Sequence, residues 1–160
     1  MIVYIASYPR SGNFWLQNLF GNQFRRLATN IHEMSNDIDS YRRFANFAKR
    51  YYGVEVLSFE NSDTTLPKRL SNWIVRYKHP DETVIRKAIL PGCLSLLDDL
   101  DIRSHLANDK DHYILKTHLP PYSSYLKGEY VLQIVRNPGA CLWSYYNFKR
   151  DNLNRTDDNL

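Results

Sequence analysis

The sequence predicts an α/β fold in which a parallel β-sheet of the doubly wound type is flanked by helices. Two units carry this prediction: apolar runs at residues 2–7 and 130–135 are each followed by a loop and then by a helical pattern. Strands that alternate with helices form parallel sheets, because each helix returns the chain to begin the next strand in the same direction. A chain of 160 residues is the size of one domain, so we expect residues 1–160 to form a single domain.

The first unit lies at the start of the chain. The run from Ile2 to Ser7 is short, apolar and rich in β-branched residues, which is typical of a buried strand. A loop with one glycine, Tyr8 to Asn13, follows it. From Phe14 onward apolar residues recur at gaps of three and four, the spacing of an amphipathic helix. These residues are Trp15, Leu16, Leu19, Phe20, Phe24 and Leu27.

The middle of the chain, residues 30–111, carries weaker signals. Apolar spacing predicts helices near residues 40–51 and 94–106, and the segment 78–82, punctuated by Pro and Asp, predicts a turn.

Two further strands are predicted in the last third of the chain. Residues 112–116 form one of them, and two prolines at 120 and 121 place a loop from about His118. Residues 130–135 form the other. Asn137 and Pro138 then suit the cap and first position of a helix, which we expect to give way to a polar tail at residues 151–160.

Composition excludes several classes of function. The net charge of +4 comes from scattered basic residues, which suits a small anionic ligand and not a nucleic-acid surface. The sequence shows no signal peptide and no membrane span, so we expect a cytoplasmic protein that binds neither nucleic acid nor membrane. The two cysteines, Cys93 and Cys141, are far apart and indicate no metal or redox site.

The loop after the first strand has the setting of a phosphate site. Backbone N–H groups and the positive end of a helix dipole converge where a strand leads into a helix. Gly12 permits close backbone approach, Ser11 and Asn13 offer side-chain hydrogen bonds, and Arg10 adds a cation. The spacing GxxxxGK[ST] of the usual nucleotide loop is absent. A plain structural turn is the alternative interpretation.

Three other residues are candidates for chemistry. Lys116 and His118 are two apart, so they face the same side if the strand persists, and a histidine there is suited to take a proton from an alcohol. Arg136 at a strand end and Ser144 two turns into the next helix suit a second phosphate. The alternative is that Arg136 pairs with a surface carboxylate and Ser144 only packs. We interpret the other four histidines as structural.

These segments, in this order, resemble the sulfotransferases that use 3'-phosphoadenosine-5'-phosphosulfate. The segment Tyr8-Pro9-Arg10-Ser11-Gly12-Asn13-Phe14-Trp15 resembles the family's YPKSGTTW loop for the 5'-phosphosulfate, and Lys116-Thr117-His118-Leu119-Pro120 resembles its KTHLP segment. Arg136, followed eight residues later by Ser144, resembles its 3'-phosphate segment.

The resemblance implies a P-loop-like three-layer domain and sulfuryl transfer without a metal. His118 is implied as general base, and Arg10 and Lys116 as cations that offset charge on the sulfuryl group. The donor is implied to bind the loop and the 3'-phosphate segment, through Arg10, Ser11, Gly12, Asn13, Phe14, Trp15, Arg136 and Ser144. The acceptor is expected to be the hydroxyl of a small molecule or a glycan: an alcohol, a phenol or a sugar.

The sequence departs from the family pattern at three points. Arg10 replaces a lysine and keeps its charge, whereas Phe14 replaces a threonine and loses a hydroxyl. The late segment that closes over the nucleotide is missing, so we expect the domain to be incomplete at its C-terminus. This favours association with a second copy or a completing chain, and it leaves a non-catalytic binder of the nucleotide as an alternative. A small-molecule kinase of the P-loop type is a third hypothesis, which the absent Walker lysine disfavours.

Overall fold

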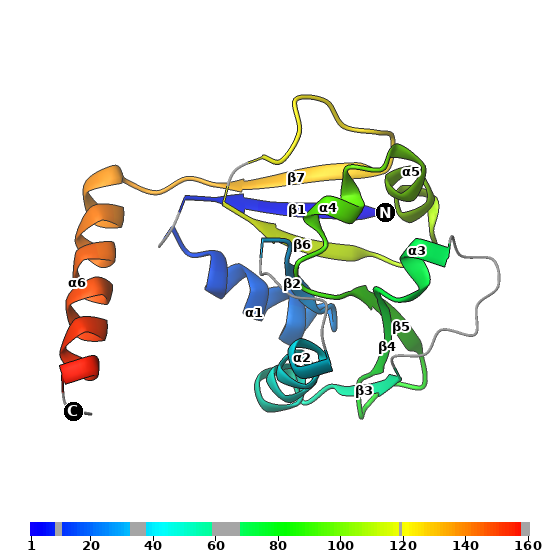
Figure 1. Cartoon of the computed structure of the whole chain (residues 1–160), viewed down its shortest axis with the longest axis horizontal. Helices are drawn as coiled ribbons and strands as arrows, with labels where there is room; N and C mark the ends of the chain where they lie inside the picture. Colours follow the sequence, from blue (N-terminus) through cyan, green and yellow to red (C-terminus); the bar gives the residue numbers. More distant parts are fainter. Residues whose placement is uncertain (9–10, 33–37, 59–67, 119, 158–160) are drawn as a thin grey trace.

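The computed structural model describes residues 1–8, 11–32, 38–58, 68–118 and 120–157. Its centre is a four-stranded parallel sheet with strand order β2-β6-β1-β7 (Figure 1). The strands are β1 (Ile2–Ser7), β2 (Ala28–Asn30), β6 (Tyr113–Thr117) and β7 (Glu129–Ile134). This sheet, flanked by helices, confirms the predicted α/β class.

The first strand lies in the middle of the sheet, and all six of its residues are buried. It pairs in parallel with β6 on one side, where Ala6 lies opposite Thr117, and with β7 on the other. Inner strands of a parallel sheet are covered on both faces and therefore read as continuous apolar runs. This is why residues 2–7 were predictable as a strand.

Helices cover the two faces of the parallel sheet. On one face, α1 (Asn13–Gln23) packs Leu16 and Phe20 against Val3 and Ile5. On the other face, α4 (Leu94–Leu97) and α5 (Leu100–Asn108) pack against the opposite side of β1 and β6. The arrangement is the predicted three-layer one (Figure 1).

A second sheet in the middle of the chain was not predicted. It is antiparallel, with order β3-β4-β5, and its strands are β3 (Glu55–Ser58), β4 (Ile74–Lys78) and β5 (Ile85–Ile89). The predicted turn at residues 78–82 joins β4 to β5. The short helix α3 (Lys68–Ser71) precedes β4, and α2 (Ile38–Tyr52) corresponds to the helix expected near residues 40–51 and packs on this sheet.

A close approach joins α2 to α1. A side chain at Gly21 of α1 would collide with the ring of Tyr52 at the end of α2. Glycine is therefore required at this crossing, and it brings the second sheet and its helix against the first unit.

The helix expected over residues 94–106 is in fact two helices. The carboxylate of Asp99 accepts hydrogen bonds from the backbone N–H groups of Asp101 and Ile102, at 3.0 and 3.4 Å, and so begins α5 as a new helix. An N-cap of this kind favours a helix start over continuation of the preceding turn. The prediction of one helix was wrong for this reason.

The last helix, α6 (Pro138–Asp157), begins as predicted. The Asn137 side chain accepts a hydrogen bond of 3.2 Å from the N–H of Ala140 and caps the helix. The helix continues through the segment expected to be a polar tail, because no glycine or proline interrupts residues 151–157. Among the residues that the structure describes, no helix is long and apolar enough to cross a bilayer.

Candidate active site

The candidate site lies where the parallel strands end. Because β1, β2 and β6 run in the same direction, their carboxyl ends meet at one edge, with Ala6 opposite Thr117 and Asn30 opposite Lys116. In an open parallel sheet this edge is the usual place for ligands. Residues from three distant parts of the sequence are therefore brought together.

His118 follows β6 directly at this edge. Its Nδ1 lies 3.3 Å from the carbonyl oxygen of Ser7, and its Nε2 lies 3.2 Å from Nζ of Lys116, so the two side chains do share a face, as predicted. A neutral ring that donates its Nδ1–H to Ser7 carries its basic lone pair on Nε2. The surroundings thus select one tautomer.

Burial lowers the pKa of His118 below the usual histidine value, and the nearby charge of Lys116 lowers it further. Both causes disfavour the imidazolium form. The ring is therefore mainly neutral at neutral pH, which is the state that a general base requires.

The loop before α1 has the backbone geometry of an anion site. Gly12 has φ 108°, a left-handed conformation that other residues rarely adopt, and it stands at the N-cap of α1 without a side chain to cap the helix. Ser11 donates its N–H to the carbonyl of Tyr8 at 3.1 Å, which closes the turn. The first N–H groups of the helix therefore have no side-chain cap at Gly12. Arg10 lies outside the described residues.

Asn13 binds the protein through its side chain. It is 7% exposed, and its Nδ2 donates to Oγ of Ser7 at 2.7 Å and to the carbonyl of Thr117 at 3.4 Å. Gln17 donates in turn to Asn13 Oδ1 at 2.9 Å. We expected this side chain to hydrogen-bond a ligand; instead it joins the start of α1 to the ends of β1 and β6.

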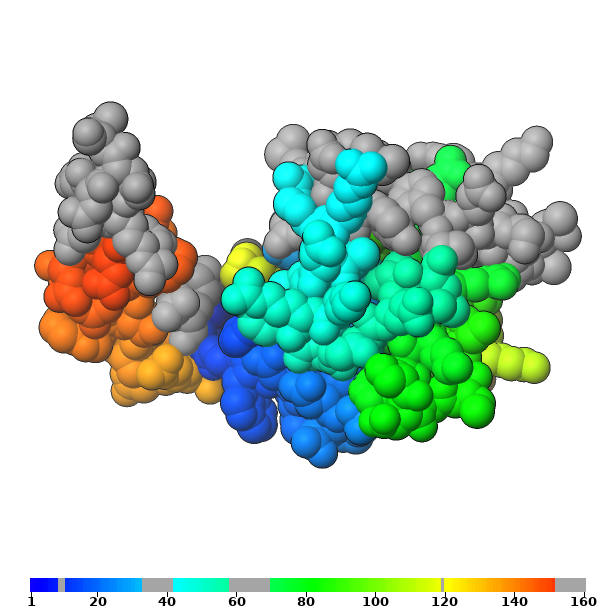
Figure 2. Space-filling model, turned by 90° about the horizontal axis from the view of Figure 1, so that it is seen from below, coloured from blue at the N-terminus to red at the C-terminus, as the bar shows by residue number. Residues whose placement is uncertain are grey.

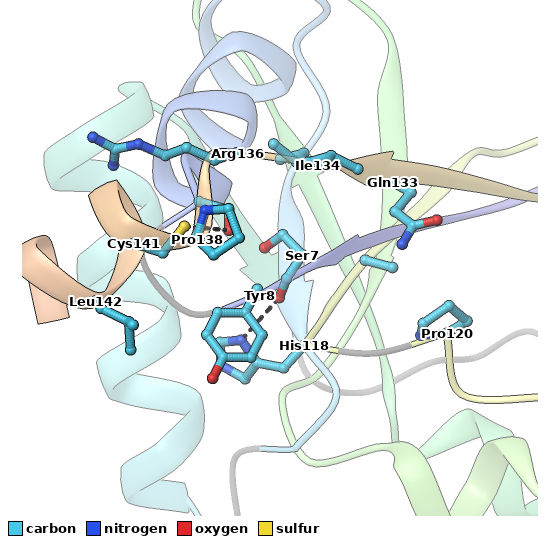
Figure 3. Close-up of a pocket in the computed structure, with 13 residues that line it drawn as sticks. Ser7, Tyr8, His118, Pro120, Gln133, Ile134, Arg136, Pro138, Cys141 and Leu142 are labelled. Carbon is cyan, nitrogen blue, oxygen red and sulfur yellow. Dashed lines mark hydrogen bonds between the residues drawn. The ribbon is translucent and has the colours of Figure 1, made fainter.

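Two cavities meet at His118. The larger has a volume of about 740 Å³, and its walls bring together most of the residues that the motifs singled out. These are Gly12, Asn13, Phe14, Lys116, His118, Arg136 and Ser144. The smaller, of about 370 Å³, lies between the end of β1, the end of β7 and the start of α6 (Figure 3). His118 and Arg136 belong to both walls.

A family model described as the sulfotransferase domain matches residues 2–159. The chain belongs to the sulfotransferase family. Neither the search of curated proteins nor the search of solved structures found a match. The family match confirms the resemblance carried by the three motifs.

The sulfotransferase presents its 3'-phosphate segment on α6. Arg136 lies just before the helix, and Ser144 is half-buried on it, facing the larger cavity. In Figure 2 this helix, in orange, stands out from the body that carries α1 and α2, in blue and cyan. The larger cavity is thus bounded by the sheet edge and α1 on one side and by α6 on the other.

Two other predicted residues differ in placement. Ser11 is buried, and its hydroxyl lies 3.5 Å from Sγ of Cys141, on the wall of the smaller cavity. Trp15 is 66% exposed on α1 and contributes to neither wall, whereas its neighbour Phe14 lines the larger cavity and meets the ring of Tyr51 edge to face.

The sequence analysis missed one residue of the sulfotransferase site. His32, interpreted as structural, follows β2, and its Nε2 lies 2.8 Å from Oγ1 of Thr117. Its charge is one of the causes that lower the pKa of His118. Only the pairing of the three-residue strand β2 with β6 brings it there, so no spacing in the sequence could have found it.

Proposed function

We propose that this sulfotransferase transfers the sulfuryl group of 3'-phosphoadenosine-5'-phosphosulfate to a hydroxyl group, with His118 as general base. The observation that carries the proposal is the position of His118 on the boundary of both cavities, with one tautomer selected and its pKa lowered. A base at such a boundary is able to serve an acceptor in one cavity and a donor in the other.

The larger cavity suits the donor. A nucleotide with two phosphate positions needs cations, backbone N–H groups and a surface for its base, and this wall offers Lys116, Arg136 and the start of α1. It also carries four aromatic rings: Phe14, Phe47, Tyr145 and Phe148. By resemblance, Arg136 and Ser144 are assigned to the 3'-phosphate, and Ser11 to Trp15 to the 5'-phosphosulfate.

The transfer step uses the protein's own groups as follows. Nε2 of His118 takes the proton of the acceptor hydroxyl, and the oxygen forms a bond to sulfur. The bond between that sulfur and the bridging oxygen of the 5'-phosphate breaks, and the electron pair leaves with 3'-phosphoadenosine-5'-phosphate. Lys116, which contacts His118, offsets the negative charge of the transferring group, as we expect of Arg10 as well. A cation fixed beside developing charge lowers the barrier without rearranging during the reaction.

The test combines binding with turnover. The purified chain is titrated by calorimetry with 3'-phosphoadenosine-5'-phosphate, with AMP and with ATP plus magnesium. It is then incubated with the sulfated donor and a panel of hydroxyl acceptors. We expect binding that depends on the 3'-phosphate, and equal amounts of sulfated product and desulfated nucleotide. Binding without any product would contradict the enzymatic proposal and favour a non-catalytic binder. A preference for ATP with magnesium would favour a kinase.

A further inference from the structure

The smaller cavity is built from chemistry unlike that of the larger one. Most of its wall is apolar, whereas the larger wall carries Lys116, Ser144, Gln17 and two asparagines. The apolar contributors are Ala6, Tyr8, Pro120, Ile134, Val135, Pro138, Cys141 and Leu142. A volume of about 370 Å³ is in the range of sites for small molecules.

The polar side chains of this wall are few, and two of them already have protein contacts. The hydroxyl of Ser7 accepts the amide of Asn13, and the hydroxyl of Ser11 lies against Cys141. His118 and Gln133 are the polar groups near the middle of the wall in Figure 3, and the guanidinium of Arg136 points away from them. A ligand with one hydroxyl finds a partner here. A sugar would bring several hydroxyls against an apolar wall and leave them without hydrogen bonds, at a cost in free energy for each.

The mouth of the cavity leaves large apolar side chains in contact with solvent. Leu142 on α6 is 62% exposed, Val135 after β7 is 82% exposed, and Tyr8 after β1 is also exposed. Figure 3 shows Leu142 and Pro120 on either side of Tyr8 and His118. An apolar ligand seated beside His118 would cover these side chains, and burial of apolar surface would contribute to its binding.

We propose that the smaller cavity is the acceptor site and that its substrates are apolar alcohols or phenols with a single hydroxyl directed to His118, not sugars. This assignment rests on the proposed function. The two cavities share His118, so a hydroxyl that enters from the apolar side meets the base from the face opposite to the donor groups.

The test compares two acceptors and two neighbouring residues of one helix. The acceptors are 2-naphthol and methyl glucoside, each supplied with the sulfated donor. The variants are Leu142→Asp and, as a matched control, Trp143→Ser, because Trp143 is equally exposed on α6 and lies outside both cavity walls. Binding of 2-naphthol to the chain saturated with 3'-phosphoadenosine-5'-phosphate is measured separately, by ligand-observed NMR.

We expect kcat/KM for 2-naphthol to exceed that for methyl glucoside at least about a hundredfold, the discrimination available when a ligand's polar groups are left unpaired. Leu142→Asp should weaken 2-naphthol binding about tenfold or more, because it places a charge at an apolar wall, and Trp143→Ser should not. Equal turnover of the sugar, or unchanged 2-naphthol binding in Leu142→Asp, overturns the acceptor assignment. If 2-naphthol binds with the expected dependence on Leu142 but no acceptor is sulfated, the apolar site stands and the transfer reaction fails.

Discussion

The sheet edge and helix α6 both wall the larger cavity, but the protein holds them in different ways. At the edge, Ser7, Asn13 and Thr117 are buried and joined by hydrogen bonds, and the ring of His118 is held against this cluster. On α6, Cys141 is the only buried residue among those whose side chains are described, and Trp143 is 67% exposed.

This difference separates two kinds of contribution to the site. The proposed base is fixed by the core, so its geometry depends on the stability of the sheet. The groups proposed for the 3'-phosphate stand on a helix whose described residues have little buried surface, so they affect ligand affinity with small effects on stability. Substitutions in the two regions should therefore fail in different ways.

The largest effect is expected from His118→Ala at the sheet edge. Loss of the general base should lower kcat by about 10²–10⁴-fold. The affinity for 3'-phosphoadenosine-5'-phosphate should change little, since the ring contributes one part of a large wall. Steady-state kinetics and calorimetry measure the two quantities, and His105→Ala on α5 is the control. A kcat within tenfold of the parent value would remove His118 from the reaction.

Arg136→Ala tests the region of α6. We expect the affinity for 3'-phosphoadenosine-5'-phosphate to fall about 10–100-fold, the effect of losing a hydrogen-bonded charge pair, while the affinity for AMP is retained. Arg150→Ala on the same helix is the matched control, because Arg150 is paired with Asp151 at the surface. Parallel losses for both nucleotides would mean that Arg136 does not recognise the 3'-phosphate.

Asn13→Ala should break the rule that binding residues cost only affinity. Removal of the amide leaves the carbonyl of Thr117 and the hydroxyl of Ser7 without this partner. We expect the free energy of unfolding to fall by about 1–3 kcal/mol, together with kcat. Urea denaturation measures the first quantity, and Gln17→Ala, at the half-buried end of the same network, should cost less. An Asn13→Ala variant as stable as the parent would show that the network does not tie the loop to the sheet.

The pH dependence of activity tests the environment of His118. Its lowered pKa means that the ring loses its proton at a lower pH than ordinary histidine, so the neutral base persists further into acid. The acidic limb of kcat/KM should therefore have its midpoint below about 6.5. Lys116→Gln removes the second cause of the shift and should move the midpoint upward, while burial, the first cause, remains. A midpoint at or above the ordinary value in the parent protein would be inconsistent with this environment.

The smallest effect is expected from Trp143→Ser on the exposed face of α6. Its ring stacks on Tyr146 of the same helix and is otherwise exposed. The free energy of unfolding should stay within about 0.5 kcal/mol of the parent value. A loss above about 1.5 kcal/mol would show that this face is covered in solution, and the contrast with the sheet edge would then disappear.

The parts of the fold that were predictable have local causes. A buried parallel strand reads as an apolar run, as residues 2–7 do, and Asn137 with Pro138 starts a helix through contacts within one turn. The second sheet was missed because its strands mix apolar and charged residues, such as Val75 with Arg76 in β4 and Lys87 with Ala88 in β5. Their pairing is decided by packing against α2, which no local pattern encodes.

The candidate site divides in the same way. The spacing of Lys116 and His118 was enough to predict that they share a face, because side chains alternate along a strand. The inward direction of Asn13 was not predictable, since its partners at Ser7 and Thr117 lie on two different strands. The proximity of His32 to Thr117 depends in turn on the parallel pairing of β2 with β6.

The sequence by itself determined the family, the alternation of strand and helix, and the glycine at position 12, because these depend on residue identity and on neighbours a few positions away. Only the tertiary structure decided which groups meet at His118. The carbonyl of Ser7 that orients the ring, and the two cavities that share it, come from segments far apart along the chain. They are brought together by sheet pairing and burial, whose free energy depends on the whole fold and not on any local pattern.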